Sequence, residues 1–222
     1  MRIFDAVVWT SYGHFVLDSS DGDAASDMVE AFAGQSNGLC GAGCPGLLFL
    51  RIGPHTAEVR FRVEVLDAPP RLDGGWEEIV EVSFAPVTTQ LCLASCMGEI
   101  YDLPDLQQLG VHRVRYSAAR MDEAREAEAN LTERGPGEES LDCYLLQLWP
   151  APSAPDQLIR QSSEIAAYWY DCSVLLRRIP QRRKQFHDHR NGPGPAPQAD
   201  ARPSGPRSAR SRRCAAACRP GP

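Results

Sequence analysis

Alternation of apolar and polar residues is the clearest pattern along this chain. In the stretch AEVRFRVEV, residues 57–65, the apolar side chains fall on one face and four charged side chains fall on the other. A period of two residues is typical of a β-strand with one buried face and one wet face. Residues 76–84 repeat the pattern. Short apolar runs between turn residues predict seven more strands, at residues 3–10, 14–18, 47–52, 91–94, 99–103, 111–116 and 142–149.

Two segments have a helical pattern instead. Residues 121–131 are rich in Ala, Glu and Arg, which predicts a short helix that crosses outside the sheets. Over residues 155–170, apolar side chains recur at helical spacing, and a cap at Ser153 with Asp156 in the first turn predicts a second helix docked on a sheet. About nine short strands with few helices favour a mainly β fold: an antiparallel β-sandwich with a short crossing helix and a docked C-terminal helix.

Charge and aromatic content divide the chain in two. Residues 181–222 hold ten Arg or Lys and two Asp, a net charge of +8, so the rest of this chain of net charge −6 carries −14. Of the 17 aromatic residues, only Phe186 lies beyond residue 170. A segment with so few large apolar groups cannot offset its chain entropy by burial. We therefore predict a β-sandwich domain over residues 1–176 and a disordered basic tail, rich in Pro, Gly and Arg, over residues 177–222.

Apolar runs are short throughout, and none approaches the roughly 18 to 20 residues of a membrane span. The opening MRIFDAVVW is interrupted by Asp5 and has no small-residue cleavage site, so we read no signal peptide. We therefore expect a cytoplasmic protein with no membrane contact.

Cysteines form three Cys-x3-Cys pairs: Cys40/Cys44, Cys92/Cys96 and Cys214/Cys218. This spacing allows two thiolates to reach one zinc ion. Cys92 and Cys96, however, lie at even spacing on a strand pattern, which is typical of small apolar fillers. We expect no metal and no cofactor, and zinc binding by the pairs is the alternative.

A glycine-rich stretch, GQSNGLCGAGCPG, precedes the strand LLFLRI. Because it leads into a strand, we read it as a turn rather than a phosphate-binding loop. Its Gln35 and Asn37, together with His55 and Glu58, are candidates for a small-ligand-binding or hydrolytic site, since a His and acid pair can act as a general base. The sequence has no Gly-x-Ser-x-Gly or His-Glu-x-x-His motif, which favours a protein that is not an enzyme.

Charged and aromatic side chains suggest a second kind of site. Arg113 and Arg115 share one face of a predicted strand, and with Trp76 they form a candidate recognition face for a protein partner. The alternative is a solvated face whose ion pairs contribute only about 0.2 to 1 kcal/mol each. The acids of residues 121–131 and the net charge of −14 suit a basic partner. Nucleic acid is expected to be contacted only through the basic tail.

Four segments carry a resemblance to known proteins: GQSNGLCGAGCPGLLFLRIGPHTAEVRFRVEV, WEEIVEVSF, VHRVRYSAARMDEAR and YLLQLWPAPSAP. Over residues 5–170 they resemble an actinobacterial family of small uncharacterised β-proteins. The order of elements is more remotely similar to the competence protein J family, which implies a β-sandwich that binds and inhibits a nuclease. The chain departs from that pattern at PDLQQLGVHRV, where His112 takes an aromatic position. Together these features predict a non-enzymatic protein-binding module, an inhibitor or immunity-type partner of a nuclease or another basic protein.

Overall fold

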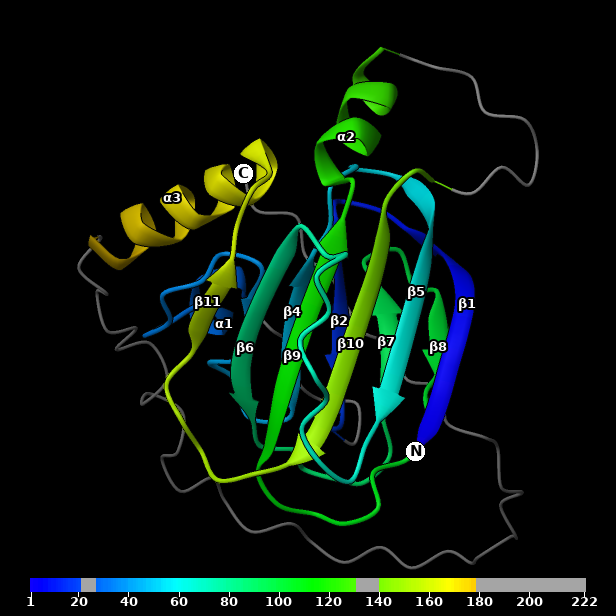
Figure 1. The fold of residues 1–222 in the computed structure, drawn as a ribbon, viewed down its shortest axis with the longest axis vertical. Helices are drawn as coiled ribbons and strands as arrows, with labels where there is room; N and C mark the ends of the chain where they lie inside the picture. Colours follow the sequence, from blue (N-terminus) through cyan, green and yellow to red (C-terminus); the bar gives the residue numbers. More distant parts are fainter. Residues whose placement is uncertain (21–26, 131–139, 179–222) are drawn as a thin grey trace, which may run out of the picture.

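Two β-sheets packed face to face make up the body of the protein (Figure 1). The computed structural model describes residues 1–20, 27–130 and 140–178. The larger sheet has the strand order β1 (Arg2–Thr10), β5 (Ala57–Val65), β10 (Cys143–Pro150), β9 (His112–Ala119), β6 (Glu78–Phe84) and β11 (Gln157–Arg160). The smaller sheet has the order β3 (Cys40–Gly41), β4 (Leu47–Arg51), β2 (His14–Asp18), β7 (Cys92–Ser95) and β8 (Ile100–Asp102). The predicted mainly β sandwich is confirmed.

The strands pair antiparallel, as predicted, with one exception. The central strands β5 and β10 are parallel, with Phe61 opposite Tyr144 in the register. All nine predicted strands are present, and the bounds of β2 and β5 match the prediction. The sequence pattern did not predict β3, β11 or the one-turn helix α1 (Met28–Ala31). The crossing helix is α2 (Met121–Ala129), and the rest of its predicted range lies outside the described residues. The predicted tail also lies outside them, apart from residues 177 and 178, which belong to α3 (Glu164–Arg178).

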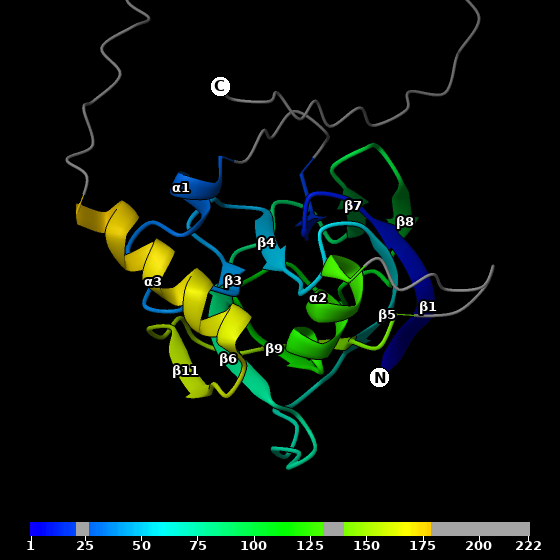
Figure 2. The same cartoon turned by 90° about the horizontal axis from the view of Figure 1, so that it is seen from above.

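The C-terminal helix starts later than predicted. Residues 157–160 are not helical; they form β11, which pairs antiparallel with β6 at the edge of the larger sheet. The prediction that Leu158 and Ile159 face the core is therefore wrong, and both side chains are exposed. Helix α3 begins only at Glu164. In Figure 2, which looks down on one end of the sandwich, α3 runs along the side formed by β6 and β3. Helix α2 lies over the middle of that end.

Side chains from elsewhere in the fold help to cap the start of α3. The buried Glu78 carboxylate accepts hydrogen bonds from the backbone N–H groups of Ser162 and Ser163, at 2.7 and 2.6 Å. Asp122 of α2 accepts from those of Glu164 and Ile165, at 2.7 and 2.9 Å. The first N–H groups of a helix have no partner within the helix, and negative charge is favourable there. A local cap adds to them, because Ser163 Oγ accepts from the Ala166 N–H at 3.2 Å. Glu78, Asp122 and Ser163 thus take the place of the cap that the sequence suggested at Ser153.

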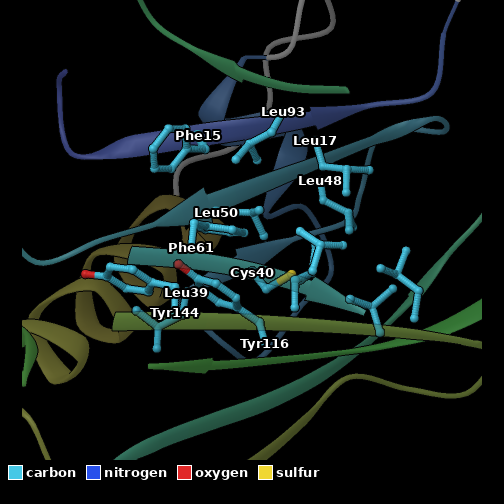
Figure 3. Packing of buried hydrophobic residues seen from close by; sticks show 14 of the residues in the cluster. Phe15, Leu17, Leu39, Cys40, Leu48, Leu50, Phe61, Leu93, Tyr116 and Tyr144 are labelled. Atoms are coloured by element: carbon cyan, nitrogen blue, oxygen red, sulfur yellow. The ribbon is translucent and has the colours of Figure 1, made fainter. Parts of the chain in front are cut away.

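The core lies between the sheets and is built from large side chains of both (Figure 3). Phe61, Tyr116 and Tyr144 of the larger sheet stack on one another with ring centroids 5.9–6.3 Å apart. Phe15 of the smaller sheet meets Phe61 edge-on at 5.4 Å. The Tyr116 hydroxyl donates to the Arg51 carbonyl and that of Tyr144 to Asp142, so each buried phenol has a partner. The alternating apolar face of β5 is thus buried as predicted.

Ionisation of Glu78 is expected to oppose folding. Burial raises the pKa of its carboxyl, although hydrogen bonds from Ser162 and Ser163 lower it in part. A raised pKa means that the native state holds this proton more tightly than the unfolded chain does. Stability therefore falls as pH rises from the ordinary Glu value of about 4.3 toward the raised pKa. We expect Glu78→Gln to flatten this fall, as measured by urea unfolding across that pH range.

Glu126→Gln, at an exposed position of α2, is the matched control and should leave the pH profile of the native chain unchanged. If the free energy of unfolding changed equally with pH in the native chain and in Glu78→Gln, ionisation of Glu78 would not be what opposes folding.

Candidate functional site

The structure places the predicted site residues in four separate regions. Gln35 and Asn37 lie in the loop before β3, and His55 lies in the turn between β4 and β5. Glu58 is exposed on β5, opposite Trp9 of β1. The remaining residues, Trp76, Arg113 and Arg115, belong to the outer face of the larger sheet.

The amides of Gln35 and Asn37 shape their own loop. Asn37 is fully buried, and its Oδ1 accepts from the N–H groups of Leu39 and Cys40 at 3.1 and 2.7 Å. Gln35 accepts from the Ala42 N–H at 2.6 Å and donates to the Cys40 carbonyl at 3.3 Å. These bonds hold the glycine-rich turn in place. Both side-chain amides therefore stabilise their own loop.

Asp156 fixes this loop to the linker that precedes β11. One of its carboxylate oxygens accepts from the backbone N–H groups of Ser36 and Asn37, at 2.6 and 2.8 Å, and from both of their side chains. Burial alone would raise the pKa of Asp156, but these hydrogen bonds outweigh it and lower the pKa. The residue predicted to cap a helix therefore ties two distant loops together.

His55 opens onto a pocket at the end of the sandwich that carries α2 and α3. This end pocket has a volume of about 300 Å³. Two rings stand at its mouth, Tyr12 at 54% and Tyr168 at 55% exposed. Its lining comes from the β1–β2 turn, the β4–β5 turn, α2 and α3: Tyr12, Gly13, Ile52, Gly53, His55, Arg125, Ile165, Tyr168 and Trp169. Apart from His55, the sequence singled out none of these as site residues.

Carboxylates of α2 hold the walls of the end pocket together. Glu128 accepts from the backbone N–H groups of His55 and Thr56 at 2.7 and 2.8 Å, and Asp122 caps α3 as described above. A Cβ on Gly53 would lie 2.5 Å from the Met121 carbonyl oxygen, so only glycine allows α2 to pack this closely. These contacts join the β4–β5 turn and α3 to α2.

The His55 ring contacts the Tyr12 ring, with centroids 5.0 Å apart. Its Nδ1 lies 2.9 Å from Thr56 Oγ1. Among the described residues no hydrogen bond or ion pair joins His55 to Glu58, and Gln35 and Asn37 do not line the pocket that His55 lines. A hydrolytic or small-ligand site made of these four residues stays a prediction.

Behind the end pocket, Arg51 holds α3 against β4. Its guanidinium lies 3.8 Å from the Trp169 ring centroid and 5.0 Å from that of Phe49, and the side chain also contacts the Met28 sulfur. Burial lowers the pKa of Arg51 to about 10. In the part of the chain that the structure describes, no carboxylate forms an ion pair with it. Stacking of a cation on two rings therefore takes the place of a salt bridge.

The two predicted arginines are buried in the outer face of the larger sheet. Arg115 donates to Glu81 at 2.8 and 2.9 Å, and Arg113 lies 3.5 Å from the same carboxylate. Arg115 also donates to the carbonyls of Pro70 and Arg71, which lie in the connection between β5 and β6. This connection, residues 66–77, crosses in front of β9 and β10 in Figure 1. Beneath it lies a cavity of about 320 Å³ that Trp76 and Arg115 both line.

Thiols in the described residues are not arranged as a metal centre. No group of three or more His, Cys, Asp or Glu side chains within residues 1–20, 27–130 and 140–178 is placed to hold a metal ion. Burial raises the pKa of the Cys40 thiol well above its ordinary value, which disfavours the thiolate that zinc needs. Cys214 and Cys218 lie outside the described residues.

Sequence patterns contained weak signals for the end pocket. The dipeptide Tyr12-Gly13 between two predicted strands marks a turn, and the run Tyr168-Trp169-Tyr170 places aromatic side chains on a helix. These signals did not show that the two segments meet, because the packing of α3 depends on caps from Glu78 and Asp122.

The fold and these sites define a two-sheet β-protein with an aromatic pocket at one end and a polar cavity on one face. No helix in the described part of the chain has the length and apolar character needed to span a membrane.

Comparison with known proteins gives few matches. No protein-family model matches the chain, and no curated protein matches it. One solved structure with a similar fold, described as crocagin biosynthetic gene J, is 13% identical with a TM-score of 0.44, over 68% of this chain and 98% of that one. Another is ComJ from Bacillus subtilis, an inhibitor of the DNA degrading activity of NucA. It is 15% identical with a TM-score of 0.42, over 68% of this chain and 96% of ComJ. The similarity to ComJ is weak, and membership of the actinobacterial family stays a prediction.

Proposed function

We propose that this protein is a non-enzymatic, cytoplasmic protein-binding module that engages a basic partner through the end pocket and the acidic surface beside it. The observation that carries the proposal is the pair of exposed tyrosines, Tyr12 and Tyr168, at the mouth of an apolar pocket. Tyr, Trp and Arg are the residues that most often dominate binding energy at protein interfaces, and all three types line this pocket.

The pocket is preorganised rather than loose. Glu128 fixes the β4–β5 turn and Asp122 fixes the start of α3, so the two segments that carry His55 and Tyr168 are both anchored on α2. A rigid aromatic surface loses little side-chain entropy when it binds a partner. This arrangement favours a docking surface over a solvent-filled gap.

Backbone strain places Tyr12 at the mouth of the pocket. Tyr12 has a φ of +59°, a left-handed conformation that costs a non-glycine residue free energy. The residue nevertheless remains more than half exposed, so burial in the domain, chiefly against the His55 ring, compensates little for this cost. A partner that covers the ring would supply the missing contact area.

Charge indicates what kind of partner fits. Residues 1–180 carry a net charge of −14, and exposed acids lie on the helices around the pocket: Glu123, Glu126, Glu164 and Asp171. Such a surface attracts a cationic protein and speeds association. Nucleases expose a positive groove where they bind the phosphate backbone. We therefore propose an inhibitor or immunity-type role against a DNA-degrading nuclease.

Titration of purified basic nucleases with the full chain tests this function. We expect loss of DNA cleavage at a one-to-one ratio for the target nuclease, with binding that weakens as salt is raised. Tyr12→Ala and Tyr168→Ala should each raise the Kd at least about tenfold, as for a central aromatic anchor. Calorimetry at matched salt measures both values.

Leu109→Ala is the matched control. Leu109 is 57% exposed and precedes β9, at the end of that strand opposite to α2. It should leave the Kd unchanged. Nucleases that keep full activity in excess of this chain, or equal losses for Leu109→Ala and Tyr168→Ala, would refute the proposal.

A further inference from the structure

The cavity on the face of the larger sheet shares no lining residue with the end pocket. We name it the sheet-face cavity; its floor is formed by β5, β9 and β10, and its cover is the connection of residues 66–77. Its lining, apart from the apolar Ile79 and Leu145, is polar or aromatic: Arg62, Glu64, Arg71, Asp73, Trp76, Arg115, Ser117 and Gln147. A volume of about 320 Å³ corresponds to roughly ten water molecules, which is room for one small molecule.

Two oxygen atoms on the floor, Ser117 Oγ and Gln147 Oε1, have no hydrogen-bond partner among the described residues. Ser117 is only 2% exposed, and in the described part of the chain its hydroxyl makes no hydrogen bond. It lies on the face of β9 opposite to the core residues Val114, Tyr116 and Ala118, so it faces the cavity. Gln147 donates through Nε2 to Glu64 at 2.8 Å, and this leaves its Oε1 as an acceptor without a partner among the described residues. Neither oxygen is among the buried side-chain atoms without a partner, so both reach the open space of the cavity, where water or a bound polar molecule can hydrogen-bond to them.

Charges around the sheet-face cavity already balance. Arg115 is paired with Glu81 at 2.8 Å, and Arg62 is paired with Glu64 at 2.7 Å. The remaining lining charges, Arg71 and Asp73, are opposite in sign and come from the same connection. Neither an anion nor a cation would therefore find an uncompensated partner on the floor.

Trp76 supplies a half-buried indole as one wall. An aromatic face packs against C–H groups, while the Ser117 hydroxyl can both donate and accept, and the Gln147 carbonyl accepts. A molecule that satisfies all three presents hydroxyl groups at its edge and C–H groups on its face, and it carries no charge. We propose that the sheet-face cavity binds a small neutral polyhydroxylated molecule of the size of one sugar ring. This proposal does not depend on the end pocket.

Nuclear magnetic resonance titration of the full chain tests the proposal, with D-glucose, D-galactose, D-mannose and myo-inositol as probes. We expect saturable shifts of the Trp76 indole N–H and the Gln147 side-chain amide with at least one probe, at a millimolar Kd. Ser117→Ala removes one hydrogen bond and should weaken that Kd about fivefold.

Ser95→Ala is the matched control, because the Ser95 hydroxyl is also buried without a partner but lies on β7 of the smaller sheet. It should leave the sugar Kd unchanged. The proposal is overturned by the absence of saturable shifts with all four probes, or by a sugar Kd that Ser117→Ala leaves unchanged. The same shifts produced by inorganic phosphate would also overturn it, since they would show an anion site.

Discussion

Phe61→Ala is expected to lower the free energy of unfolding by about 3 to 5 kcal/mol. Phe61 is fully buried at the centre of β5 and contacts the rings of Phe15, Tyr116 and Tyr144. Removal of its ring leaves a cavity between the two sheets, which the parallel β5–β10 pair at the middle of the larger sheet cannot close by small shifts. Urea unfolding followed by fluorescence measures the loss.

Val7→Ala is the control for this experiment. Val7 lies on the neighbouring strand β1, opposite Arg60, and it is 38% exposed. We expect a change below about 1 kcal/mol for it. A loss of that small size for Phe61→Ala as well would show that the β5 face is not the centre of the core.

Arg115→Ala is expected to cost a similar amount, about 3 to 5 kcal/mol, for an electrostatic reason. The Arg115 side chain is 8% exposed and the Glu81 side chain 12% exposed, so the truncation leaves a carboxylate buried beside Arg113 alone. It also removes the donor that holds the carbonyls of Pro70 and Arg71 to the sheet. We therefore expect faster hydrogen exchange in residues 66–77 together with the lower unfolding free energy.

Two further variants separate charge from packing. Arg60→Ala breaks an exposed 2.9 Å pair with Asp5 and should cost no more than about 1 kcal/mol. The triple variant Arg113→Met, Arg115→Met and Glu81→Leu removes all three buried charges of this cluster and should recover most of the stability lost in Arg115→Ala. Failure of the triple variant to recover any stability would contradict the electrostatic explanation.

Periodicity predicted the sandwich well because its strands are half-buried and regular. The alternation in residues 57–65 has a period of two residues, which only a strand explains, and β5 has the predicted bounds. Residues 155–170 show the limit of this method. Leu158 and Ile159 fit a helical spacing, but pairing with the edge strand β6 holds them extended, and β6 is far away in sequence. No local pattern carries that information.

For the site residues, too, local patterns predicted the strand face but not the contacts made by distant segments. Alternation placed Arg113 and Arg115 on one face, but it did not predict that the connection of residues 66–77 would cover that face and bury them. Asn37 has the composition of a binding loop, yet its amide is consumed by Leu39, Cys40 and Asp156. The end pocket joins residues 12, 55 and 168, and only the folded chain brings them together.

Whether a nuclease docks on the end pocket can be measured by hydrogen exchange of the full chain, with and without a saturating amount of the nuclease that it inhibits. We expect slower exchange on binding in residues 12–14, 53–56 and 165–172, which surround the end pocket. We expect no change in residues 62–64 and 113–117 on the face of the larger sheet. Protection confined to that face, with exchange around Tyr12, His55 and Tyr168 unaltered, would show that the end pocket is not the docking surface.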